Sequence, residues 1–132
     1  MRVLFNLNRD VDLVLVDKVQ IQQVLLNLIR NAVEAMAGSE RRELTLSSAP
    51  ADEDLVEILV TDTGPGISDG VAARLFQPFV TTKEHGMGVG LSICRTIIES
   101  QGGQIWSTAN PGGGTVFHLT VPQASAEELA DV

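Results

Sequence analysis

The sequence has few aromatic residues, a single cysteine and no long apolar run. Aromatic residues make up 4% of the chain and tyrosine is absent, so there is no platform on which nucleic-acid bases could stack. The formal net charge of -8 argues against the basic surface that binds phosphate backbones. No apolar stretch approaches the roughly 18 residues of a membrane-spanning helix, and no secretory signal precedes the first strand-like segment. The lone Cys94 excludes an intramolecular disulfide and fits a reducing cytosol, so we expect a cytoplasmic domain that binds neither nucleic acid nor membrane.

The length and composition are those of one globular domain. The chain has 132 residues, of which 44% are hydrophobic, which is enough to bury a core without metal or disulfide support. We expect residues 1–122 to form this domain and residues 123–132 to form a loose acidic tail.

The order of periodic segments predicts an α/β fold. Strands are expected at 3–8, 13–16, 43–48, 55–61, 105–109 and 115–121, with Val56, Ile58 and Val60 on one face and Phe117, Leu119 and Val121 on a core face. A helix is expected from an Asp17 cap to Gly38, a short one after Ser68, and a long one over 88–101. Consecutive pairs of strands favour a two-layer sandwich with a mixed sheet over a doubly wound parallel sheet.

The first long helix carries a polar stripe within an otherwise apolar sequence. At about 100° per residue, one arc of roughly 100° holds six polar side chains, and apolar residues cover most of the remainder, so we expect the helix to be largely buried. The stripe consists of Gln20, Gln23, Asn27, Arg30, Asn31 and Glu34. Carboxamides suit a cavity for a polar ligand, and their oxygens are ligands that Mg²⁺ accepts. A solvated edge that is rich in amides would give the same pattern.

Two glycine-rich segments are typical of ligand-binding turns. DTGPGI (62–67) follows a buried strand, and Asp62 could accept a hydrogen bond from an exocyclic amine such as adenine N6. A plain turn with an acidic residue is the alternative. HGMGVGLSI (85–93) opens the second long helix, whose N-terminal backbone N–H groups could bind phosphates. It matches neither G-x-G-x-x-G nor G-x-x-x-x-G-K-[ST].

The order of these motifs resembles one known architecture. NLIRNAVEA (27–35) looks like the N box, DTGPGI the G1 box, LFQPF (75–79) the F box and GMGVGLSI (86–93) the G2 box, with GGGT (112–115) at the end. The chain from about Val11 to Pro122 resembles the catalytic and ATP-binding domain of two-component sensor histidine kinases. These kinases share a superfamily with gyrase, heat-shock chaperone and MutL ATPases, and the wording of the motifs is most like the FixL and NtrB branch. The resemblance implies a Bergerat-type ATP-binding fold with ATP and Mg²⁺ as cofactors.

The same resemblance assigns roles to individual residues. Asn31 would coordinate Mg²⁺, with Asn27 and Arg30 near the phosphates and Glu34 as a further polar group on the stripe. Asp62 would bind adenine N6 with help from Thr115, and residues 76–87 would form a lid over the nucleotide. The catalytic candidates are therefore Asn31, Asn27, Arg30, Glu34 and Lys83. The other nucleotide-binding candidates are Asp62, Gly64, Gly66, Ile67, Phe76, Thr81, Thr82, Gly86, Met87, Gly88, Val89, Gly90, Leu91 and Thr115.

The phosphoaccepting histidine of the family has no counterpart in this chain. His85 and His118 match no acceptor motif and are interpreted as structural or surface residues. We expect a monomer whose partner is a histidine-bearing helical hairpin of a longer parent chain, and indirectly a response regulator. The favoured function is a kinase module that transfers the γ-phosphate of ATP to a histidine on another domain. The alternatives are an ATP-hydrolysing relative and a nucleotide-binding module without chemistry. In the hydrolysing relatives a Glu takes the position of Asn27, and an amide cannot act as a base at neutral pH.

Overall fold

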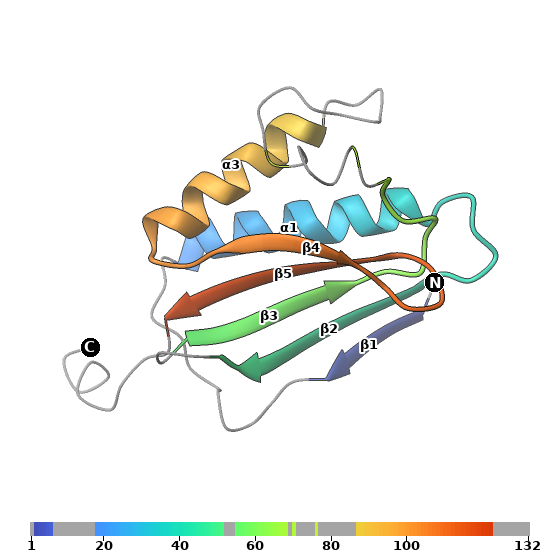
Figure 1. Cartoon of the computed structure of the whole chain (residues 1–132), viewed down its shortest axis with the longest axis horizontal. Coiled ribbons are helices and arrows are strands. Elements are labelled where there is room, and N and C mark those ends of the chain that lie inside the picture. Colours follow the sequence, from blue (N-terminus) through green and yellow to red (C-terminus); the bar gives the residue numbers. More distant parts are fainter. Residues whose placement is uncertain are drawn as a thin grey trace.

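The fold consists of one five-stranded sheet with two long helices on one of its faces (Figure 1). The structure is a computed structural model, and it describes residues 2–6, 18–51, 55–68, 70, 76 and 87–122. The helices are α1 (Lys18–Ala35) and α3 (Met87–Ser100). The strands are β1 (Arg2–Asn6), β2 (Glu43–Pro50), β3 (Leu55–Thr61), β4 (Ile105–Ala109) and β5 (Thr115–Pro122). The predicted two-layer α/β sandwich is confirmed.

The sheet is mixed, and its strand order is β1-β2-β3-β5-β4. β1 runs parallel to β2, whereas the pairs β2–β3, β3–β5 and β4–β5 are antiparallel. The hairpin β4–β5 and the consecutive pair β2–β3 match the expected succession of strands. Because β5 lies between β3 and β4, the end of β3 and the start of β5 are neighbours, with Thr61 opposite Val116. This pairing brings together the two strand ends that form the candidate functional site described below.

The core lies between the sheet and the helices, as the alternation of the strands predicts. Val56 and Val60 of β3 are buried, and Ile58 packs partly buried against the same cluster. From β5, the core receives Phe117, Leu119 and Val121. The helices contribute mainly Val24, Leu28, Ala32 and Met36 of α1 and Leu91, Cys94, Ile97 and Ile98 of α3.

The outer side of α1 is more exposed than the sequence predicts. Val19, Leu26 and Val33 are 74%, 60% and 38% exposed, so the expectation that the helix is largely buried is wrong for this side of it. These residues are seven positions apart and therefore share one stripe of the helix. The reason is architectural: in a two-layer fold, α1 has the sheet on one side and α3 on a flank, and nothing in the described residues forms a third layer.

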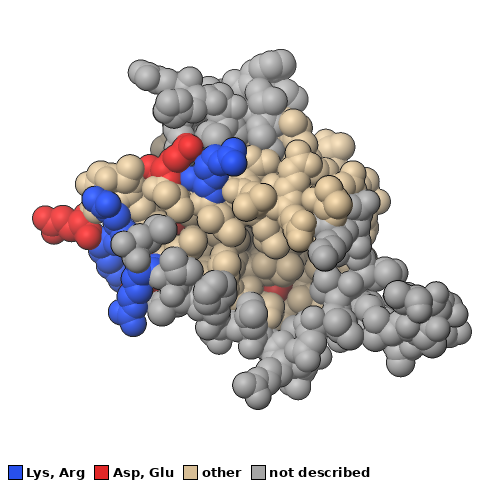
Figure 2. All heavy atoms as spheres, turned by 180° about the vertical axis from the view of Figure 1, so that it is seen from behind, with Lys and Arg blue, Asp and Glu red and all other residues tan. Residues whose placement is uncertain are grey.

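Several predictions fall on residues that the structure does not describe. They are the strand at 13–16, the Asp17 cap, most of the helix after Ser68, residues 77–86 of the proposed lid, and the tail at 123–132. None of the helices in the described ranges combines the length and apolar character that crossing a bilayer requires. Seen from behind, charged side chains gather mainly toward one end of the described surface (Figure 2).

Candidate functional site

The central residue of the candidate site is Asp62, which follows β3 directly. It is only 2% exposed, and a buried carboxylate needs hydrogen bonds because it has lost its water. Its Oδ1 accepts hydrogen bonds from the backbone N–H of Gly64 at 2.9 Å and from that of Thr115 at 3.2 Å. The Asp62 backbone N–H in turn donates to the Thr115 carbonyl at 2.9 Å. The carboxylate is therefore held in one orientation by main-chain groups of two segments.

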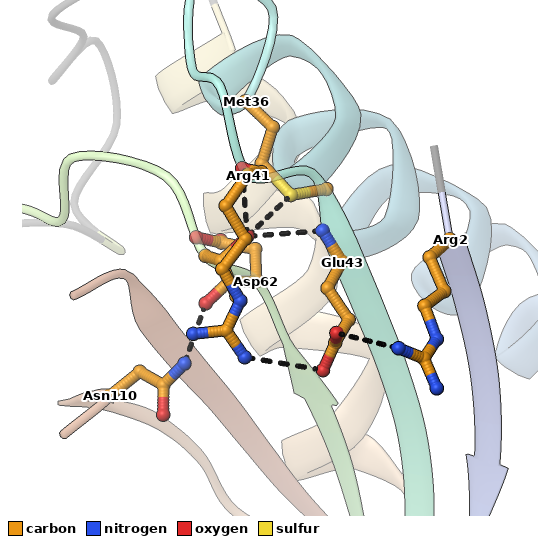
Figure 3. A network of polar contacts seen from close by, with 7 residues as sticks. Arg2, Met36, Arg41, Glu43, Asp62 and Asn110 are labelled. Atoms are coloured by element: carbon orange, nitrogen blue, oxygen red, sulfur yellow. Dashed lines mark hydrogen bonds and ion pairs between the residues drawn. The ribbon is translucent and has the colours of Figure 1, made fainter. Parts of the chain in front are cut away.

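The side chain of Asn110 adds a further contact to Asp62. Its Nδ2 donates to the Asp62 carbonyl oxygen at 2.8 Å, across the gap between the β4–β5 turn and the end of β3 (Figure 3). This residue was not predicted as a site residue. The one available signal was its place as the first residue of the turn NPGGG, where Asn is common for local reasons.

On its other side, the Asp62 turn is attached to the start of β2 through Thr63. The Thr63 hydroxyl donates to the Arg41 carbonyl at 3.0 Å and accepts from the Glu43 backbone N–H at 3.0 Å. The Glu43 carboxylate lies 3.4 Å from Arg41 Nη2 and 3.9 Å from Arg2 Nη1. These ion pairs involve exposed guanidinium groups, so they contribute little to stability. Thr63 was also missed, because its partners are distant in sequence.

Glycines allow the segments around Asp62 to approach closely. A Cβ at Gly64 would lie 3.0 Å from the carbonyl oxygen of Ala35, near the C-terminal end of α1. Gly114 has a φ of +113°, and a Cβ there would lie 2.0 Å from the carbonyl oxygen of Asp62. Only glycine fits this position without displacing the backbone of one strand or the other. The GGGT segment thus serves the contact between β5 and the Asp62 turn.

A pocket of about 380 Å³ opens between residues 65–67 and the β4–β5 hairpin. Its lining includes three predicted nucleotide-binding residues, Gly66, Ile67 and Thr115, but neither Asp62 nor Asn31. The pocket therefore borders the Asp62 turn on the side of the hairpin.

The polar stripe of α1 is partly buried. Asn31 is 7% exposed, Asn27 and Glu34 are half-buried, and Arg30 is exposed. Among the described residues the buried polar or charged side chains are Asn31, Asp62, Thr115 and Thr120. Burial of polar groups is costly unless they are satisfied, so their concentration at three predicted site residues distinguishes this region from an ordinary solvated edge.

Other members of the stripe face α3. The Gln101 amide donates to Gln20 Oε1 at 3.2 Å, and the side chain of Asn27 hydrogen-bonds to Cys94, whose side chain is fully buried. Burial raises the pKa of the Cys94 thiol to about 11, and the bond from Asn27 opposes this rise. Cys94 is therefore a core residue.

The second glycine segment does open a helix, since α3 begins at Met87. The side chain of Leu91 belongs to the hydrophobic core, so a phosphate contact from this residue would come from its backbone N–H. Phe76 is half-buried and packs edge to face on Phe117, with ring centroids 6.3 Å apart. The structure describes only the backbone of Met87, Gly88, Val89 and Gly90, and Thr81, Thr82, Lys83 and Gly86 lie outside the described residues.

His118 lies on the sheet face away from the helices, as the alternation of β5 predicts. Its ring stacks on Trp106 with centroids 5.0 Å apart, and its Nε2 lies 2.7 Å from Thr108 Oγ1. Its Nδ1 lies 3.7 Å from a Glu57 carboxylate oxygen. The ring is therefore held among residues of the outer sheet face. His85 lies outside the described residues.

Comparison with known proteins gives a consistent picture. Residues 16–125 match the family model described as "Histidine kinase-, DNA gyrase B-, and HSP90-like ATPase". The sensor protein FixL of Bradyrhizobium diazoefficiens is 57% identical over 120 residues, which cover 91% of this chain and 24% of FixL. The chain thus spans about a quarter of the length of that relative.

Solved structures superpose on this chain over nearly its whole length. The nucleotide-free catalytic domain of histidine kinase ThkA superposes with a TM-score of 0.80 at 38% identity, covering 92% of this chain and 78% of that one. Full-length ShkA in complex with AMPPNP superposes with a TM-score of 0.81 at 30% identity, covering 95% of this chain and 26% of that one.

Proposed function

Because the chain belongs to the family of histidine kinase-, DNA gyrase B- and HSP90-like ATPases, we propose that it is the ATP-binding catalytic domain of a sensor histidine kinase. It binds Mg-ATP and transfers the γ-phosphoryl group to a histidine on a separate helical hairpin. The observation that carries this proposal is the buried Asp62 carboxylate, fixed by the backbone N–H groups of Gly64 and Thr115. The similarity to FixL and to the ThkA catalytic domain supports the kinase function over the hydrolase.

Asp62 selects the base. A carboxylate held in one orientation accepts a hydrogen bond from the N6 amine of adenine. Guanine presents a carbonyl oxygen at that position, so GTP would bring an acceptor against a buried acceptor. Buried groups left without a partner commonly cost about 1–3 kcal/mol, which corresponds to a preference for ATP of one to two orders of magnitude.

The residues also fit a Mg²⁺ ion brought in with the nucleotide. Asn31 has an amide oxygen on a buried side chain. An oxygen ligand of this kind suits Mg²⁺, which keeps substrate phosphates and waters as its other ligands. When bound, the ion would neutralise charge on the phosphates. Asn31 would hold the ion, and Arg30, Glu34 and Lys83 are the other polar groups that we assign to the phosphate end.

The transfer itself needs a nucleophile from outside this chain. A neutral imidazole nitrogen of the partner hairpin attacks the γ-phosphorus, the bond to the β,γ-bridging oxygen breaks, and ADP leaves. His118 is an unsuitable acceptor because its ring is stacked on Trp106 and bonded to Thr108. By the same family relationship, a response regulator would receive the phosphoryl group from the hairpin. We place the domain in the cytoplasm.

The decisive experiment compares ATP and GTP binding by calorimetry in the presence of Mg²⁺. We expect a preference for ATP of at least tenfold, and we expect Asp62→Asn to weaken ATP binding while reducing the preference. Thr120→Ser is a matched control, since Thr120 is also buried at the sheet and is not assigned to the site. Equal affinity of the wild-type chain for both nucleotides would refute the role of Asp62.

A further inference from the structure

We propose that Asn110 is a positioning residue for base recognition, which fixes Asp62 through its main chain and thereby sets the preference for adenine over guanine. The inference rests on the proposed binding of ATP at Asp62. It assigns a specificity role to the β4–β5 turn, which lies 48 positions from Asp62 in the sequence.

The Asn110 backbone is itself fixed, so its side chain can act as a support. Its N–H donates to the Gly114 carbonyl at 3.0 Å, and its carbonyl accepts from the Gly113 N–H at 2.9 Å. Both bonds close the turn at residues 110–114. From this closed turn the half-buried side chain reaches the Asp62 carbonyl oxygen at 2.8 Å (Figure 3).

The turn and the residue that follows it contact Asp62 at three further points. Thr115, which directly follows the turn, donates to the Asp62 carboxylate and accepts from the Asp62 N–H. Gly114 approaches the carbonyl oxygen of Asp62 so closely that a Cβ would lie 2.0 Å from it. The Asn110 side chain is the part of this contact that can be removed without altering the backbone path of either strand.

Fixing the main chain of Asp62 matters for selectivity more than for fold. A carboxylate fixed in one orientation accepts a well-aligned hydrogen bond from the adenine amine. In the same orientation it repels the carbonyl oxygen of guanine. If the Asp62 peptide can shift, the carboxylate can rotate away from guanine, while it binds adenine less well because the geometry must be restored on binding. Loosening therefore lowers the affinity for ATP and relieves the penalty on GTP.

A merely structural role predicts a different result. If the Asn110 bond only joined the hairpin to β3, its loss would lower the melting temperature, and the affinities for ATP and GTP would stay in their original ratio. The ratio of the two affinities is thus the readout that separates positioning from support.

The experiment measures Mg-ATP and Mg-GTP affinities and melting temperatures for the wild-type chain and three variants. Asn110→Ala removes the amide, and Asn110→Asp keeps the shape but replaces the donor by a group that only accepts when ionised. Pro111→Ala is the control, because Pro111 is an exposed residue of the same turn. We expect the ATP preference to fall roughly fivefold in Asn110→Ala, the equilibrium equivalent of one net hydrogen bond. It should fall further in Asn110→Asp and stay unchanged in Pro111→Ala.

The outcomes distinguish this inference from the proposed function. A wild-type preference for ATP that survives unaltered in a folded Asn110 variant overturns the positioning role alone. A wild-type chain without any ATP preference overturns the role of Asp62 and this inference with it. Because the two Asn110 variants differ in shape and charge, either one that folds is sufficient for the comparison.

Discussion

Replacing Gly114 by alanine tests whether the close approach of the β4–β5 turn to Asp62 is built into the fold. A Cβ at Gly114 would lie 2.0 Å from the Asp62 carbonyl oxygen and 2.9 Å from Thr63 Cα, and the residue has a φ of +113°. Gly112 provides a matched control in the same turn. It also has a positive φ, of +87°, but a Cβ there would meet nothing within 4 Å.

The difference in unfolding free energy between the two variants measures the cost of the steric clash at Gly114. An unfavourable φ costs each alanine about 1–3 kcal/mol, of which about 0.4–1 kcal/mol is returned because alanine restricts the unfolded chain. Gly114→Ala must in addition move two strands apart, and overpacking of this kind costs typically about 1–3 kcal/mol. We therefore expect Gly114→Ala to lower the free energy of unfolding by about 2–4 kcal/mol and Gly112→Ala by about 1 kcal/mol.

Urea unfolding followed by circular dichroism measures both values, with a common slope confirming that the unfolded states are comparable. In Gly114→Ala, ATP affinity should also fall, because the displaced carbonyl belongs to Asp62. Equal destabilisation of the two variants would show that the backbone angle alone matters, and would refute the argument from close approach.

Three other predictions concern the helices. Leu28→Ala should lower the free energy of unfolding by about 2–5 kcal/mol and Leu26→Ala by less than about 0.5 kcal/mol, since Leu28 is buried whereas Leu26 is 60% exposed. Similar urea midpoints for the two variants would contradict the assigned buried face of α1. Burial raises the pKa of the Cys94 thiol from 9.0 to about 11, so the stability that the neutral thiol contributes is present below pH 9 and is lost as the pH rises toward about 11. Cys94→Ser should remove this part of the pH dependence of the unfolding free energy, and an unchanged pH dependence would contradict the argument. Steady-state ATP hydrolysis without an acceptor domain should be very slow because Asn27 offers no base, and Asn27→Glu should raise it; fast wild-type turnover would favour the hydrolase.

Much of the fold was predictable because the periodicity is strong. The bounds of β3 match the expectation, and β2, β4, β5 and both long helices lie within two residues of it at nearly every end. The exposure of Leu26 and Val33 was not predictable from the helix alone. A helical pattern shows which residues are apolar, but the number of layers packed around the helix decides how many of them are buried.

The candidate site also contains residues that the sequence predicted and residues that it did not. The order of the motifs selects Asn31, Asp62 and Thr115 as candidates, and all three are buried. Thr63 and Asn110 escaped notice because hydroxyl and amide residues are common in turns for local reasons. Their importance depends on partners 22 and 48 positions away.

Local periodicity and short motifs were thus sufficient to predict the elements, the family resemblance and the candidate site residues. The surroundings of Asp62, by contrast, depend on how distant segments pack together. The placement of β5 between β3 and β4 brings Thr115 and Asn110 to the end of β3, and a hydrogen bond of this kind depends on distances of a few ångströms between segments that no local pattern relates. The orientation of the carboxylate is therefore a property of the assembled sheet.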